Sequence, residues 1–212
     1  MSTVSEIVDI IAAVSLNEDD PDSDTQTRMV RYINRAYFDI YRRVAQYLDN
    51  TEHTTQSVSV TSGSGTLSPV PLKILSVVDT TDERVLTKRS VYDIELDDPN
   101  LDSTGDAVHY YVSGGSTLKL WPIDTKTVRV RYIPKPASLS ITSLEDDIKL
   151  PAEFHDVLEF GAMYYMYMDE RDVRTSFEIT ETKGEFRQRL SQLTQYLSSN
   201  AQTQRTVQGH YF

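Results

Sequence analysis

The sequence predicts an α+β protein, in which a bundle of about four helices carries an inserted small antiparallel β-sheet and ends in an extended C-terminal arm. Two observations carry this prediction. Apolar residues recur every three or four positions towards both ends of the chain, and between Gln56 and Tyr132 the period falls to two. Helices on both sides of the strands favour one helical core with an insertion over two domains in series.

The same change of period sets the expected domain boundaries. The helical bundle is expected in two parts, residues 1–50 and 137–200, on either side of a β-rich insertion at 51–136. The arm is expected at 201–212, where apolar periodicity stops.

Two helices are predicted before the strands. Thr3 and Glu6 form a capping box at the start of the first helix. Its apolar face is expected to contain Val4, Ile7, Val8, Ile11 and Val14. After the acidic linker NEDDPDSD, a longer helix is expected from near Asp24 to about Asn50. Its apolar face is expected to contain Val30, Ile33, Tyr37, Ile40, Tyr41, Val44 and Leu48.

The middle of the chain predicts strands. QSVSVT alternates, KILSVVD suits a more buried strand, and VHYYVSGGSTLKLW suits two strands joined at a Gly-Gly turn. The stretch LKLWPIDTKTVRVRYIPKP, from Leu118 to Pro136, alternates strictly and turns once, which predicts a hairpin. SVYDIELDDPN suits either one helical turn or a loop, and both alternatives stay open.

Two further helices are predicted after the strands. Pro151 suits the first position of a helix, and Glu153 and Asp156 suit its positive end. Its apolar face is expected to contain Phe154, Val157, Leu158, Gly161, Ala162 and Tyr165. The last helix is expected from about Asp172 to Asn200, with Gly184 as a candidate kink. Its packing residues are expected to be Phe177, Phe186, Leu190, Leu193 and Leu197.

Composition excludes several classes of protein. The 212 residues are 39% hydrophobic, which suffices for a packed core, and the absence of cysteine rules out disulfides and thiolate chemistry. A net charge of -11 opposes tight, sequence-blind binding to phosphate backbones. No apolar run approaches the roughly 20 residues that a membrane span needs, and the first residues do not look like a signal peptide. We therefore expect a soluble protein made inside the cell, without membrane contact.

Two groups of cations are candidates for contacts. Arg28, Arg31, Arg35 and Arg42 fall on the polar side of the second helix. They suit ion pairs with the acidic linker, contacts with a neighbouring copy, or DNA. In the predicted hairpin, Lys119, Arg129 and Arg131 lie opposite the apolar side chains, as a solvated face or as a surface for phosphates or another subunit. Both sets of alternatives stay open.

The sequence indicates no catalytic, cofactor-binding or metal-binding residues. The acidic linker resembles the start of a calcium loop, but Thr25 stands where glycine is needed and Arg31 where a glutamate should be. The four histidines lack metal-ligand spacing. The cluster AMYYMYM suits a helix core, with a subunit interface as the alternative. We therefore predict that the protein is not an enzyme.

The C-terminal tail suits either a disordered end or an arm that becomes ordered on a partner. The candidate arm residues are Gln204, Arg205, Val207, His210, Tyr211 and Phe212.

In order and spacing, the second half of the chain resembles the head-to-tail adaptor (head-completion) proteins of tailed bacteriophages. The resemblance covers about residues 107–197. It rests on a Tyr-rich strand before Gly114 and Gly115, the Trp121-Pro122 step, the strand ending YIP, and the Leu150-Pro151 start of a helix.

The resemblance implies a virion structural protein at the head-tail junction, made in the host cytoplasm. Such proteins form a ring, of twelve copies, under the portal protein, and the ring extends the DNA channel and supports a downstream neck or tail protein. Contact with packaged DNA would be non-specific, and the C-terminal extension would dock on the portal. The alternatives are another neck, tail or baseplate ring protein, or a nucleic-acid-binding module that joins both groups of cations into one patch.

Overall fold

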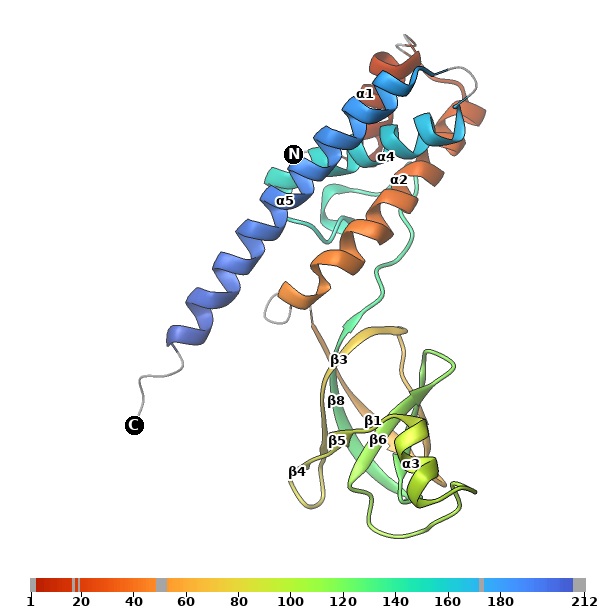
Figure 1. Cartoon of the computed structure of the whole chain (residues 1–212), viewed down its shortest axis with the longest axis vertical. Coiled ribbons are helices and arrows are strands. Elements are labelled where there is room, and N and C mark those ends of the chain that lie inside the picture. The colour runs from red at the N-terminus through yellow and green to blue at the C-terminus, as the bar shows by residue number, and fades with distance from the viewer. Residues whose placement is uncertain (1–2, 17, 19, 49–52, 172–173, 208–212) are drawn as a thin grey trace. The chain divides into compact units, whose positions relative to one another are not determined.

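The computed structural model describes residues 3–16, 18, 20–48, 53–171 and 174–207, with 201–207 described by their backbone alone (Figure 1). Contacts divide the chain into two compact units. The helical unit comprises Met1–Tyr47 and Pro136–Phe212, and the strand unit comprises Leu48–Lys135. The protein is α+β, with helices α1, α2, α4 and α5 in the helical unit and α3 in the strand unit.

Helix α1 (Val4–Leu16) begins with the predicted capping box. The Thr3 N–H donates to Glu6 Oε2 at 2.8 Å, and the Glu6 N–H donates to Thr3 Oγ1 at 3.3 Å. Most of the predicted face is buried, but Val14 is 63% exposed. Val14 lies at the edge of the buried stripe, where Ser15 is buried instead and accepts a hydrogen bond from Tyr167 Oη.

Helix α2 (Ser23–Val44) is capped by Asp22, whose carboxylate accepts the Thr25 N–H at 2.8 Å. The helix was expected to continue to about Asn50, but it tightens into the 3₁₀ turn η1 (Ala45–Tyr47). Residues 49 and 50 lie outside the described part of the chain.

Helix α4 (Asp156–Asp169) packs against α1, α2 and α5. The prediction that Pro151 begins this helix is wrong, because the 3₁₀ turn η3 (Ala152–Phe154) comes first. A further 3₁₀ turn, η2 (Glu145–Asp147), lies upstream. At Gly161 an added Cβ would lie 2.8 Å from Ala36 Cβ and 3.0 Å from Phe186 Cε2. Gly161 therefore permits the close approach of α2 and α5 to α4.

Helix α5 (Ser176–Val207) begins later and ends later than the sequence predicts. Thr175 and Glu178 form its capping box, with the Thr175 N–H 2.8 Å from Glu178 Oε2. The predicted start, Asp172, lies outside the described residues. Phe177, expected to pack, is 72% exposed in the first turn, whereas the later apolar residues are buried as predicted: Phe186, Leu190, Leu193 and Leu197.

The extended arm expected from Ala201 is helical as far as Val207. The segment AQTQRTV contains neither proline nor glycine, so nothing in it interrupts the helical hydrogen bonds of the preceding turns. The remaining candidate arm residues, His210, Tyr211 and Phe212, lie outside the described residues.

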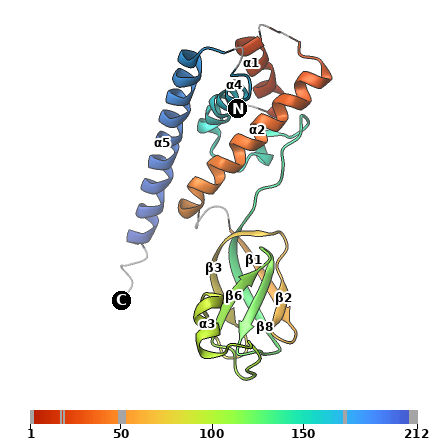
Figure 2. The ribbon, with the colours of Figure 1, turned by 45° about the vertical axis from the view of Figure 1, so that its right-hand side comes forward.

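The strand unit contains two four-stranded sheets (Figure 2). Sheet A has the order β1 (Thr54–Val60), β8 (Lys126–Pro134), β3 (Pro71–Asp79) and β4 (Arg84–Val85). Sheet B has the order β2 (Ser64–Thr66), β7 (Thr117–Trp121), β6 (His109–Ser113) and β5 (Thr87–Lys88). The prediction of one antiparallel sheet is therefore wrong, and β5 pairs with β6 in parallel.

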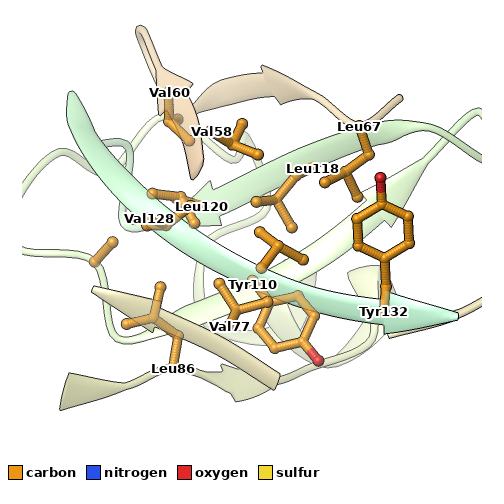
Figure 3. Packing of buried hydrophobic residues seen from close by; sticks show 12 residues of the cluster. Val58, Val60, Leu67, Val77, Leu86, Tyr110, Leu118, Leu120, Val128 and Tyr132 are labelled. Atoms are coloured by element: carbon orange, nitrogen blue, oxygen red, sulfur yellow. The ribbon is translucent and has the colours of Figure 1, made fainter. Parts of the chain in front are cut away.

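The predicted hairpin from Leu118 to Pro136 is also wrong. Its two halves are β7, which pairs with β2 and β6, and β8, which pairs with β1 and β3 in the other sheet. Alternation correctly predicted the inward-facing residues, because Leu118 and Leu120 meet Val128 in one buried cluster (Figure 3). Val130 belongs to the same cluster. The segment between the strands thus crosses from one sheet to the other around a shared core.

Helix α3 (Val91–Asp97) settles the open choice for SVYDIELDDPN in favour of a helix. Ser90 caps it by accepting the Asp93 N–H at 3.1 Å. Its only fully buried residue is Ile94.

Candidate assembly surfaces

The arginine stripe of α2 is used largely within the helical unit. Arg35 Nη1 lies 3.3 Å from Asp169 Oδ1, and its guanidinium is 4.3 Å from the centre of the Tyr165 ring. Arg28 Nη1 lies 3.8 Å from Glu170 Oε1. Arg35 and Arg28 thus meet acids at the C-terminal end of α4. Arg28 also interacts with Asp22 of the acidic linker, whose pKa is lowered chiefly by hydrogen bonds from Thr25 and further by the charge of Arg28. Arg31 lies over the Tyr32 ring at 5.5 Å, and Arg42 is exposed.

The tyrosines of α4 pack within the chain. Tyr165 Oη donates to Asp39 Oδ2 at 3.1 Å, and Tyr164 and Tyr165 both contact the Phe186 ring. Burial, followed by the charge of Asp39, raises the pKa of Tyr165. This arrangement supports the interpretation of AMYYMYM as a packing cluster.

Lys126 occupies the centre of a cage of carboxylates in the strand unit. Its Nζ lies 2.7 Å from Asp79 Oδ2, 2.7 Å from Asp106 Oδ1 and 2.8 Å from Asp124 Oδ2. The Asp79 side chain is fully buried, and that of Lys126 is 10% exposed. Arg84 Nη2 adds a second cation, 2.8 Å from Asp106 Oδ2.

The cage changes the pKa values of its members. Burial alone would raise the pKa of Asp79, but hydrogen bonds from Lys126 and the backbone of Thr81 lower it below the ordinary range. The hydrogen bond from Lys126 lowers the pKa of Asp106. Burial opposes charge on Lys126, yet its hydrogen bonds to Asp106, Asp124 and Asp79 raise its pKa. All of these groups are therefore ionised at neutral pH.

Asp79, Asp82 and Asp106 are also close enough together to hold a metal ion. The ammonium of Lys126, however, already contacts two of these three carboxylates. The lysine therefore offsets part of the negative charge of the cluster and occupies the position of a structural cation. Sequence reasoning missed this cage, because Asp79 and Lys126 are 47 residues apart and only the strand register brings them together.

The outer face of sheet B is covered by α3, which Figure 2 shows beside β6. Trp121 points to this side and donates its indole N–H to Asp98 Oδ2 at 2.9 Å, while its ring stacks on His109 at 5.8 Å. That hydrogen bond, together with one from the Ser103 backbone, lowers the pKa of Asp98 to about 2. Lys119 alternates with Leu118 and Leu120 and so shares this outer side.

The outer face of sheet A carries Arg129 and Arg131, the other two members of the predicted basic face. Arg129 is exposed and pairs with Ser57 on β1 and Val78 on β3. Arg131 Nη2 lies 3.4 Å from His53 Nδ1. The expected common face of Lys119, Arg129 and Arg131 is therefore wrong, because two sheets and their shared core separate Lys119 from the arginines.

One protein-family model matches nearly the whole chain. A family model described as SU10 adaptor protein matches residues 2–209, and so spans both units. The chain belongs to this family. The recognised likeness to phage head-to-tail adaptors is thereby confirmed, and the chain is a phage adaptor protein of a structural, virion-associated family. No curated protein matches the chain.

The structure also places part of the candidate arm and one of the four histidines. Gln204, Arg205 and Val207 lie in the last turns of α5, so any contact they make starts from a helix. His155 is 3% exposed, with Nε2 3.1 Å from the Leu150 carbonyl oxygen, and therefore has a structural position at the start of α4. In the part of the chain that the structure describes, no helix is both long and apolar enough to cross a membrane.

Proposed function

We propose that this adaptor forms a ring under the portal protein, extends the DNA channel and provides a platform for the next neck or tail protein. The match of one adaptor family model to residues 2–209 carries the proposal, because it includes the helical and strand units together. The resemblance of residues 107–197 to head-to-tail adaptors favours a ring of twelve copies. This number would match the twelve subunits of the portal that the ring contacts.

The charges support an assembly role over a DNA-binding one. The net charge is -11, and within the strand unit Lys119 lies on the outer side of sheet B, whereas Arg129 and Arg131 lie on that of sheet A. Such a chain tolerates DNA that slides past without retaining it. Contact with packaged DNA in the channel is accordingly non-specific.

The C-terminal segment is the proposed portal-binding element. It begins as the end of α5, and its side chains include Gln204, Arg205 and Val207, followed by His210, Tyr211 and Phe212. A helix that leads into an aromatic end suits docking into a groove on a partner. In this proposal, Gln204 to Val207 present the end of α5 to the portal, and the aromatic residues Tyr211 and Phe212 serve as anchors.

The test is binding to isolated portal rings from the same phage, measured by co-sedimentation and particle imaging. Three chains are compared: the full length, one ending at Val207 and one ending at Asn200. We expect the full-length chain to decorate the portal and the chain ending at Asn200 to fail. The chain ending at Val207 separates the contribution of the helical turns from that of the last residues.

Circular dichroism and thermal melting of all three chains serve as the control for folding, because Leu197 and the residues packed around it are retained. A self-assembled ring without affinity for any portal would instead indicate another neck, tail or baseplate protein. A monomer that binds DNA at moderate salt would contradict the structural role altogether.

A further inference from the structure

The solvent side of α3 carries an unusual arrangement of side chains. Tyr92 is 69% exposed and Leu96 is 66% exposed, and their spacing of four places them side by side on one face. Ile94 is buried on the opposite side of the helix. At 100° per residue, Asp93 and Glu95 fall on either flank of the exposed pair. The outward face of α3 is thus an apolar centre between two carboxylates, which is the composition of a contact surface.

The outer face of sheet A has the complementary composition. Its outward positions follow from the register of the strands. They are Thr55, Ser57, Ser59, Ser76, Val78, Val85, Thr127, Arg129 and Arg131. None of these positions on the described strands is acidic, although acids outnumber bases in the whole chain by 32 to 21. Val78 pairs with Val85, which is 65% exposed, so two apolar side chains adjoin Arg129.

We propose that α3 of one copy docks on the outer face of sheet A of the next copy in the ring. Tyr92 and Leu96 then cover Val78 and Val85, and Glu95 lies against Arg129. Neither Glu95 nor Arg129 forms an ion pair with any of the residues that the structure describes, so both charges are available to a partner. A second copy is the occupant that these charges favour, because the chain itself supplies both halves of the match.

The position of the two surfaces suits a ring. Helix α3 lies on the outer side of sheet B, where Asp98 accepts the indole N–H of Trp121. The arginine face lies on the outer side of sheet A, across the core formed by both sheets. One chain therefore cannot join its own surfaces, whereas head-to-tail contact between copies joins unlike surfaces around a rotation axis. The inference rests on the proposed ring and names the elements that close it.

Cross-linking tests the contact directly, because the chain contains no cysteine. The double variant Tyr92→Cys/Val85→Cys is assembled on portal rings and oxidised, and denaturing electrophoresis then measures the linked species. We expect a ladder beyond dimers, since each copy contributes one cysteine to each of two contacts. Each single variant is limited to dimers, and the pair Glu181→Cys/Val85→Cys, with Glu181 exposed on α5, is the matched control.

A charge swap provides the second test. Glu95→Arg and Arg129→Glu should each weaken assembly about tenfold, because each places like charges opposite one another. The double variant should recover assembly to within about threefold of the original. Glu181→Arg makes the same change of charge in the helical unit and should leave assembly unchanged. Unchanged melting temperatures show that the variants remain folded.

The outcomes separate this inference from the proposed function. Portal decoration without a ladder, or without an effect of either charge reversal, overturns the docking of α3 and leaves the portal-binding role intact. A ladder in rings that do not bind portals supports the docking and contradicts the portal-binding role. A chain that forms neither a ladder nor a ring contradicts both.

Discussion

In the helical unit, Arg35 of α2 finds Asp169 at 3.3 Å and the Tyr165 ring at 4.3 Å, both on α4. In the strand unit, Arg129 lies on an open sheet face between Ser57 and Val78. Both arginines occupy the polar side of an amphipathic element and look alike in the sequence. The difference shows that a neighbouring element decides whether a surface cation is used within the chain or remains available to another copy.

The largest expected effect is the loss of stability on removing Lys126, the cation at the centre of the carboxylate cage in the strand unit. Lys126→Ala leaves the buried Asp79 carboxylate without its ammonium and should reduce the free energy of unfolding by roughly 3 kcal/mol. Lys119→Ala, on the outer side of sheet B, should change it by less than about 0.5 kcal/mol. Denaturant unfolding of both variants checks the contrast, and equal losses would contradict the cage.

The loss of stability caused by Lys126→Ala should depend on pH. Asp79, Asp106 and Asp124 have folded pKa values below their ordinary ones, so they stabilise the fold at neutral pH. This stabilisation is lost as the pH falls through the folded values, while Lys126, whose pKa is raised, stays charged. The difference between Lys126→Ala and the original chain should therefore shrink below about pH 4. A difference that stays constant from pH 7 to pH 3 would rule this out.

A smaller effect tests how closely the helical unit is packed. Gly161→Val places side-chain atoms against Ala36 and Phe186 and should destabilise the protein by about 2 kcal/mol. At Gly184 in α5, by contrast, an added Cβ would meet no atom within 4 Å. Gly184→Ala should stabilise the helix by up to about 1 kcal/mol. Thermal melting distinguishes these changes, and a loss of stability for Gly184→Ala would indicate that α5 needs a kink there.

The smallest effect concerns the arginines that α2 uses within the chain. Arg35→Ala removes a partly exposed ion pair and should cost less than about 1 kcal/mol, measured by denaturant unfolding. It should leave assembly on the portal unchanged, in contrast to Arg129→Glu. A loss of ring formation by a folded Arg35→Ala variant would show that the α2 stripe also contacts a neighbouring copy.

Several elements could be predicted from local patterns. The capping box of Thr3 and Glu6, the apolar stripe of α2 and the buried residues of α5 depend on residues close together in sequence. Val14 and Phe177 were misplaced, because a residue at the edge or end of a stripe is buried only where another element covers it. The cage around Lys126 had no local signal at all, since its carboxylates come from Asp79, Asp106 and Asp124.

By itself, the sequence determined the α+β class, the faces of the helices and the alternation of the strands, because periodicity specifies which side of an element is apolar. It also carried the likeness to phage adaptors that the family match confirms. Only the tertiary structure decided which strands pair. A strand pattern defines an inward and an outward face but not a neighbour, so β7 and β8 entered different sheets and divided the cations between two surfaces.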